Sequence, residues 1–256
     1  MRIGVSVDIT RAVAALDSLA RTQVPFATSR TLNAVAEKVV EAEQHEMRDV
    51  FDRPTPYTLR SMRVIRSSRQ RLEAVVTFKD AFGKAQVSAS KYLAPQIKGG
   101  SRRPKRFEVA LQRAGAMPEG FRAVPGSGVR LDAYGNIPGA TIVKLLSYFR
   151  AFPEAGYRAN ITDKRRASMA KGRKGKTYGT AYFVARPGDG RLPFGIWQRT
   201  RTGFGSAIKP ILLFVDWTQY DAIFDFEYVG RKTVEREFAP AWDRELAAAV
   251  ASARTR

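Results

Sequence analysis

The chain has 256 residues and carries 44 Lys and Arg against 24 Asp and Glu, a net charge of +20, while 44% of its residues are hydrophobic. This composition supports a folded core and excludes disorder throughout the chain. The absence of cysteine excludes disulfides, Cys-ligated metals and a thiol nucleophile, and the single histidine, His45, argues against a histidine triad or metal cluster.

The N-terminal part of the chain is predicted to be mainly helical. Alternating apolar residues at positions 3–9 predict a short strand, and a first helix is expected to end near residue 21. Pro25 is expected to interrupt the helical pattern, and a longer helix is predicted over residues 27–51. The polar face of this long helix is expected to hold Glu37, Glu41, Glu43, His45, Glu46 and Asp49.

Short helices and strands are predicted to alternate along the rest of the chain. Residues 62–65 and 72–78 predict a β-hairpin, because they are rich in β-branched and apolar side chains. Further strands are predicted over 178–186, 193–200 and 207–216, and helices over 105–114, 137–150 and 228–253. The Pro- and Gly-rich stretch 115–139 predicts an ordered loop, and Pro240 predicts a kink or a break in the last helix.

This order of elements predicts an α+β fold. We expect a largely antiparallel sheet with a long N-terminal helix and a C-terminal helix packed on one face, plus extended basic loops. No linker composition divides the chain, so residues 1–256 are predicted to form a single elaborated domain, with 92–176 as an insertion or arm region. The longest apolar run, residues 211–215, is far shorter than the roughly 20 residues of a membrane span, so no membrane contact is expected.

The positive charge is unevenly distributed. Residues 1–53 carry seven basic and eight acidic side chains, so the whole excess lies beyond them. Two windows, 94–113 and 154–178, carry net charges of +5 and +6 and predict exposed loops that contact nucleic acid or an acidic protein surface. The simpler alternative is a solvated loop that keeps the protein soluble. The candidate contact residues are Lys98, Arg102, Arg103, Lys105, Arg106, Arg158, Lys164, Arg165, Arg166, Lys171, Arg173, Lys174 and Lys176.

The candidate catalytic patterns lack the structural context that their chemistry requires. Residues 170–177 fit a relaxed phosphate-binding loop, but no buried strand enters this loop and no helix leaves it. Tyrosines near the basic windows, such as Tyr148, Tyr178 and Tyr182, could stack on bases, although such side chains more often anchor loops to the core. The carboxylate pairs Glu37 with Glu41, Asp225 with Glu227 and Glu235 with Glu237 are expected to face water. We therefore predict no catalytic residues, cofactor or metal; a metal-dependent nuclease built on Asp225 and Glu227 is a minor alternative.

Several segments together resemble one group of phage proteins. They are Thr31-Leu32-Asn33-Ala34-Val35-Ala36 in the long helix, the segment from Val50 to Thr58 with its two prolines, the predicted hairpin, and Phe194-Gly195-Ile196-Trp197-Gln198-Arg199. In these features the chain resembles the minor tail protein Z group of tailed bacteriophages and the related head–tail and tail-completion proteins. The resemblance implies an α+β fold, no enzymatic activity, and multiple copies at the neck or upper end of a tail.

This resemblance leads to a functional hypothesis. We expect a structural virion protein, assembled in the host cytoplasm as a homo-oligomer, that contacts other neck, tail or portal proteins and double-stranded DNA without sequence preference. The alternative is a free, non-specific nucleic-acid-binding protein with a packaging or regulatory role.

Overall fold

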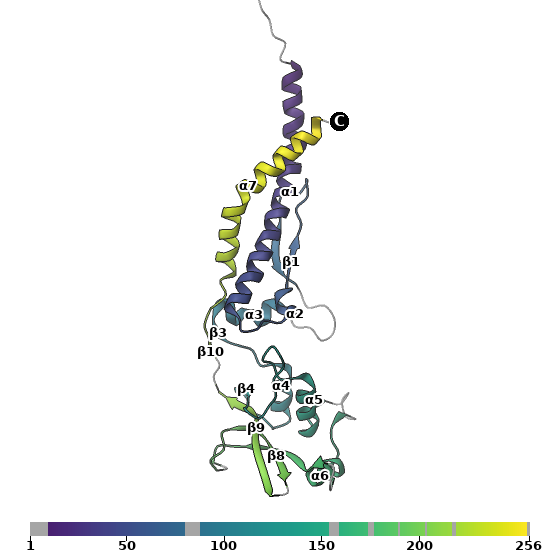
Figure 1. Ribbon diagram of the computed structural model, residues 1–256, viewed down its shortest axis with the longest axis vertical. Helices are drawn as coiled ribbons and strands as arrows, with labels where there is room; N and C mark the ends of the chain where they lie inside the picture. Colours follow the sequence, from purple (N-terminus) through teal and green to yellow (C-terminus); the bar gives the residue numbers. More distant parts are fainter. Residues whose placement is uncertain are drawn as a thin grey trace, which may run out of the picture. The chain divides into compact units, whose positions relative to one another are not determined.

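The computed structural model describes residues 10–79, 88–153, 159–173, 177–188, 190–202, 204–216 and 219–254, without the side chains of 10–20, 173, 177, 253 and 254 (Figure 1). It confirms the α+β class. The predicted strand at positions 3–9 lies outside the described residues. The contacts divide the chain into two compact units, whereas we expected one elaborated domain. The helical unit comprises Met1–Lys98 and Ala222–Arg256, and the inserted unit comprises Gly99–Asp221, a longer stretch than the predicted 92–176.

Within the described residues, the helical unit contains two long helices, two short ones and a hairpin. Its elements are α1 (Thr10–Val50), α2 (Pro56–Leu59), β1 (Met62–Ile65), β2 (Val75–Phe78), α3 (Ala89–Lys98) and α7 (Phe226–Arg254). The long helices α1 and α7 lie side by side, and α1 also packs on the hairpin (Figure 1). The hairpin is confirmed, with Met62 paired to Phe78 in an antiparallel register.

The interruption predicted at Pro25 is wrong, because α1 runs as one helix through this residue. Proline removes one backbone hydrogen bond and costs about 3 kcal/mol inside a helix. Tertiary packing offsets this cost: Ala27 and Thr31, two and six residues further on, are fully buried, and Arg30 forms an ion pair with Glu245 of α7 at 2.5 Å. The last helix likewise contains Pro240 without a break, and Figure 1 shows that α7 changes direction along its length.

One acidic residue of the long helix was placed on the wrong face. Glu37 and Glu41 are exposed as predicted and pair with Arg66 and Lys38. Glu43 instead is fully buried where α1 meets α7. Position 43 follows Val39 by one turn, so it lies on the stripe that α7 covers.

A cluster rich in aromatic residues forms a hydrophobic core in the helical unit. Met47, Met62, Leu93 and Phe224 are buried together, from α1, β1, α3 and the segment before α7. Phe51 meets Phe224 edge to face with ring centroids 5.6 Å apart. The backbone amides at 223 and 224 donate to Gln96 O, which joins the two separate parts of the chain that make up this unit.

The inserted unit is built on a four-stranded antiparallel sheet. The strands follow the order β4-β9-β8-β7, and the three strands predicted in this region are confirmed as β7, β8 and β9. The bounds are β3 (Gly100–Ser101), α4 (Arg106–Arg113), β4 (Arg122–Pro125), α5 (Gly139–Tyr148), α6 (Asp163–Lys171), β5 (Gly172–Arg173), β6 (Thr177–Tyr178), β7 (Thr180–Ala185), β8 (Gly195–Thr202), β9 (Gly205–Val215) and β10 (Gln219–Tyr220). The core beneath the sheet contains Leu111, Leu145, Ile196 and Leu212.

Two predictions for this unit need correction. The stretch 115–139 was predicted as a loop, but Arg122–Pro125 forms the edge strand β4, where a proline is tolerated. The second basic window was predicted as an exposed loop, but Asp163–Lys171 forms α6. The hydroxyl of Thr162 caps this helix, and an acidic first turn and a basic last turn match the helix dipole.

Candidate nucleic-acid interface

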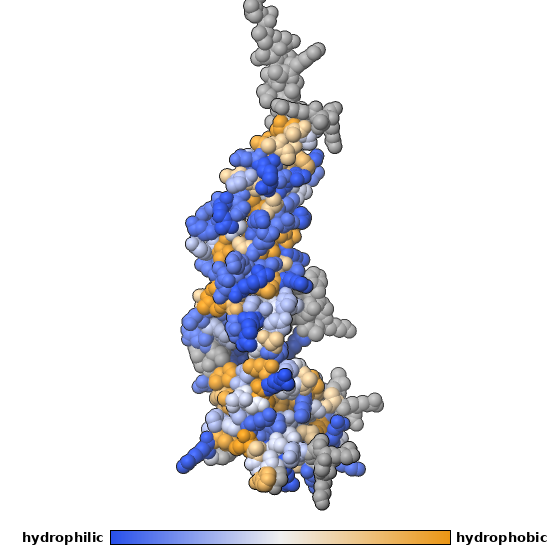
Figure 2. Space-filling view, viewed as in Figure 1, coloured by the Kyte–Doolittle hydropathy of each residue, from blue (hydrophilic) through white to orange (hydrophobic). Residues whose placement is uncertain are grey.

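Most of the net charge lies in the inserted unit. Its 123 residues contain 22 Lys and Arg against eight Asp and Glu, a net charge of +14 out of the total of +20. Figure 2 shows strongly hydrophilic side chains projecting from this unit between hydrophobic ones. Some of these cations are free to bind a partner, whereas others form contacts that hold the fold together.

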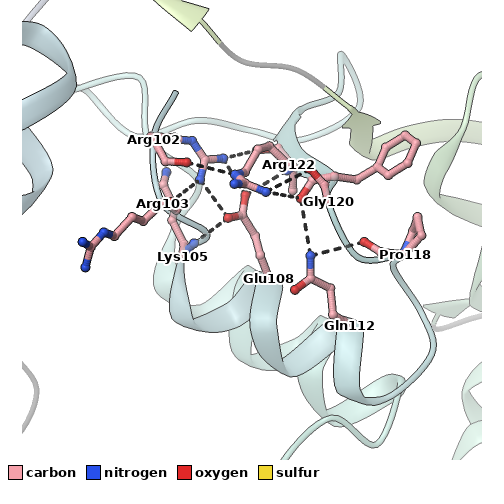
Figure 3. Close-up of polar contacts among 10 residues, drawn as sticks. Arg102, Arg103, Lys105, Glu108, Gln112, Pro118, Gly120 and Arg122 are labelled. Atoms are coloured by element: carbon pink, nitrogen blue, oxygen red, sulfur yellow. Dashed lines mark hydrogen bonds and ion pairs between the residues drawn. The ribbon is translucent and has the colours of Figure 1, made fainter. Parts of the chain in front are cut away.

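Arg102 belongs to the fold. Its side chain is only 14% exposed, and its guanidinium forms a bidentate pair with Glu108, Nη1 to Oε2 at 2.7 Å and Nη2 to Oε1 at 2.5 Å. The fully buried Glu108 carboxylate also accepts hydrogen bonds from the backbone amides of Lys105 and Ala123 (Figure 3). The charge of Arg102 is thus paired inside the unit, so Arg102 is less available to a partner than the exposed cations of the predicted set.

The ionisation of this network follows from its contacts. Burial acts to raise the pKa of Glu108, but the hydrogen bonds from Arg102, Ala123 and Lys105 outweigh it and hold the pKa below its usual value. The hydrogen bond to Glu108 raises the pKa of Arg102. Desolvation and the charge of Arg102 lower the pKa of Lys105, although the residue as a whole is exposed. The salt bridge therefore stays charged at neutral pH.

Arg122 of β4, which was not predicted, extends the network. Its Nε donates to Arg102 O at 3.1 Å, and its Nη1 donates to the carbonyls of Gly120 and Phe121, each at 3.0 Å (Figure 3). These bonds tie the loop before β4 to the segment before α4. The sequence alone does not reveal a long-range role of this kind, because Arg122 cannot be distinguished there from the other cations of a basic chain.

The remaining cations of the first window divide between the two units. Lys98 ends α3 in the helical unit and is exposed. Arg103, Lys105 and Arg106 are exposed at the start of α4 in the inserted unit. These three residues are the part of the predicted set that remains available to a partner here.

The second window also contains both structural and exposed cations. Lys164, Arg165 and Lys171 are exposed on α6. Arg166 instead lies over the ring of Tyr148, 4.9 Å from its centroid, and donates to Tyr148 O. Of the other predicted contact residues, Arg158, Lys174, Lys176 and the side chain of Arg173 lie outside the described part of the structure.

A pocket of about 420 Å³ opens between α5 and α6. Its wall contains Lys144, Ser147, Tyr148, Asn160, Arg165 and Met169. Ser147 and Asn160 use their side chains in hydrogen bonds to the backbone of residues 159 and 152, so the two cations supply the charge of the pocket. Lys144 was missed by the sequence prediction, because it is a single cation within an apolar helix. A phosphate group is the kind of ligand that such a pair can bind.

The aromatic side chains near these cations belong mainly to the core. Tyr148 and Tyr182 are both buried and meet edge to face with centroids 5.1 Å apart. Tyr178 is 69% exposed, so it remains available for stacking.

The carboxylate pairs have structural partners. Asp225 accepts a hydrogen bond from Tyr228 N at the start of α7, and Glu235 and Glu237 pair with Lys232 and Arg236. Across the described ranges, no three His, Cys, Asp or Glu side chains form a group that could hold a metal ion. Helices long and apolar enough to cross a membrane are likewise missing from the described part of the chain.

Comparison of the chain with models of known protein families, with curated proteins and with solved structures finds no match.

Proposed function

We propose that the chain is a non-enzymatic structural subunit of a tailed-phage virion, a neck or tail-completion protein that assembles in symmetric copies at the head–tail junction or upper tail. In this role the inserted unit contacts DNA or a neighbouring subunit. The resemblance of the segments 31–36, 50–58 and 194–199 to the minor tail protein Z group supports the phage assignment.

The observation that carries the proposal is the concentration of charge in one folded unit. A net charge of +14 on 123 residues repels itself unless a polyanion is near. The exposed cations Lys164, Arg165 and Lys171 lie on a capped helix, so they are held in place for an anionic partner. Non-specific contact with phosphates needs charge and position but no base-reading geometry.

The helical unit offers surfaces for contacts between copies. On α7, Tyr228, Val234 and Phe238 are 49%, 42% and 38% exposed. Figure 2 shows hydrophobic residues between the charged ones along the helices. Apolar side chains at the surface of long helices favour helix packing between subunits, which supports a homo-oligomer.

The proposal is tested by the composition of phage particles. Particles carrying a tagged copy of the full chain are purified, and quantitative mass spectrometry measures its ratio to the portal protein. We expect a fixed ratio of several copies per particle that survives washing in high salt. A chain that stays in the soluble fraction, outside purified particles, contradicts the structural role.

The same charge also supports the second candidate, a free non-specific nucleic-acid-binding protein. Sedimentation of cell extracts separates the two. A packaging or regulatory factor sediments as a small oligomer that nuclease treatment releases from DNA, whereas a virion subunit sediments with particles after the same treatment.

A further inference from the structure

A second hollow of the inserted unit, distinct from the α5–α6 pocket, combines cations with an apolar floor. This groove has a volume of about 540 Å³ and lies between α4 and the segment that follows α5. Arg106, Arg113 and Arg150 line it together with apolar residues that include Val109, Ala114 and Phe152. Among the described residues that line it there is no Asp or Glu.

Helical spacing places two of the arginines along one rim. Arg106 and Arg113 are seven residues apart on α4, which is two turns or about 10 Å along the axis. Val109 follows Arg106 by three residues, so it lies between the two arginines on the same face. Leu111 points the other way and is fully buried in the core. The face therefore presents a cation, an apolar side chain and a second cation in order.

The third arginine is fixed in place. Arg150 adopts a left-handed backbone conformation, with φ of 56°, at a position after a helix where glycine is favoured. Its Nε donates to Ile161 O at 3.3 Å, and its guanidinium forms an ion pair with Asp163. Arg150 is thus partly neutralised. Arg106 and Arg113, by contrast, have no ion pair within the described part of the chain and are exposed.

The apolar floor selects the class of partner. A DNA backbone satisfies the arginines but leaves Val109, Ala114 and Phe152 in contact with water. A protein segment can place an apolar side chain on the floor and carboxylates against the two guanidinium groups, which bind carboxylates in a bidentate manner. In an extended segment, residues i, i+2 and i+4 share one face and span about 13 Å, which long arginine side chains can bridge.

We propose that this groove binds an extended acidic segment of a neighbouring protein chain, with acidic side chains at i and i+4 and a large apolar side chain at i+2. The inference rests on the proposed role of the inserted unit as a contact surface and names the chemistry of its protein partner. DNA is then bound elsewhere on the unit, by cations such as those of α6.

The test uses the full chain and two labelled peptides. One peptide repeats Glu-Ser-Leu-Ser, and the other has serine in place of every leucine, so both carry the same charge. Fluorescence anisotropy measures their binding at physiological salt. We expect the leucine peptide to bind at least about tenfold more tightly than the serine peptide, because only the former covers the floor.

Matched variants locate the binding site. Arg106→Gln with Arg113→Gln should weaken binding of the leucine peptide by about tenfold or more, and Lys164→Gln with Arg165→Gln, the same change of charge on α6, by less than about threefold. Ala114→Trp, at an exposed position on the groove, should remove the advantage of the leucine peptide and leave the affinity for a random DNA duplex unchanged. Circular dichroism checks that each variant is folded.

Three results would overturn the inference. They are equal binding of both peptides, equal weakening by the two double variants, and loss of duplex DNA binding on changing Arg106 and Arg113 with no effect on the peptide. The last would identify nucleic acid as the ligand of the groove. None of these results bears on the proposed structural role, which is tested separately by the stoichiometry of the particle.

Discussion

The carboxylate of Glu43 on α1 lies against Gly230 on α7, so close that a Cβ atom at position 230 would stand 3.5 Å from Glu43 Oε1. Glu43 is fully buried, and neither of its carboxylate oxygens has a hydrogen bond of good geometry among the described residues. Burial, followed by the negative charges of Glu46 and Asp225, raises the pKa of Glu43 to about 8. The backbone of Gly230 acts to lower the pKa of Glu43, but this effect is smaller than that of burial. The contact between the two long helices therefore contains a carboxyl group that is mainly protonated at neutral pH.

This contact predicts that the helical unit loses stability as pH rises. The folded state holds the Glu43 proton up to about pH 8, while the unfolded chain releases it near its ordinary value of 4.5. The contribution of this proton to the free energy of unfolding is thus fully present below pH 4.5. It is lost as pH rises toward 8, by roughly 1 kcal/mol per pH unit. Denaturant unfolding followed by circular dichroism should show this slope in the wild type and a flatter profile in Glu43→Gln. Glu41→Gln, at an exposed position on the same helix, serves as the control, and parallel profiles for wild type and Glu43→Gln would refute the prediction.

Replacing Glu108 with Gln should destabilise the inserted unit strongly. The change leaves the Arg102 side chain, which is 14% exposed, without its counter-charge, and breaking a buried ion pair in this way costs about 3–5 kcal/mol. Because the folded state lowers the pKa of Glu108, its contribution is present above the ordinary value of 4.5 and is lost as pH falls through the folded pKa. Hydrogen exchange of peptides from 99–221 measures the loss.

Two controls sharpen this prediction. The exposed Glu119→Gln should change stability by less than about 0.5 kcal/mol. Replacing Arg102 and Glu108 together by methionine should restore part of the stability, since no unpaired charge is then buried. The recovery is incomplete because the backbone amides of Lys105 and Ala123 lose their acceptor. If Glu108→Gln alone exchanges like the wild type, the pair does not stabilise the unit.

Gly195→Ala should disrupt the four-stranded sheet. A Cβ at position 195 would lie 2.1 Å from Leu212 O and 2.9 Å from Leu213 Cα, both backbone atoms of the neighbouring strand β9. We expect a loss of about 2 kcal/mol or more, because the backbone must move to relieve the clash. Gly139→Ala, at the first residue of α5 with nothing near the added atom, should be neutral or slightly stabilising. Thermal unfolding of both variants provides the comparison, and equal midpoints would contradict the prediction.

Charge removal on α6 should weaken DNA binding in a salt-dependent way. Lys164→Gln, Arg165→Gln and Lys171→Gln together should lower affinity for a random duplex and reduce the slope of log K against log salt by about 0.9 for each phosphate that the variant no longer neutralises. The matched control changes Arg48, Lys91 and Lys232, exposed cations of the helical unit, in the same way. Titrations at several salt concentrations measure the slopes, and an identical effect of both sets would show that only the net charge matters. Arg102 is left out of the set, since its removal would break the buried pair with Glu108 and destabilise the unit.

The local elements were largely predictable from the sequence. Helical spacing of Phe107 and Leu111 identified α4, and β-branched runs identified β7, β8 and β9, because periodicity reflects which face of an element is buried. The edge strand β4 was missed, because four residues within a Pro- and Gly-rich stretch carry too short a pattern. Pro25 was expected to interrupt the helix, because the contacts that compensate for it are tertiary, such as the ion pair of Arg30 with Glu245, 215 residues later in the chain.

The residue types of the candidate site were predictable from the sequence, but their arrangement in space was not. The sequence by itself determined that the cations are concentrated after residue 53, that cysteine chemistry is excluded, and that a single histidine argues against a histidine triad or metal cluster. Only the tertiary structure decided that Arg102 and Arg166 hold the fold, that Arg106 and Arg113 share a groove, and that Glu43 is buried. The physical reason is that the sequence specifies which residues are charged, whereas the partner and the solvation of each charge depend on which distant segment packs against it.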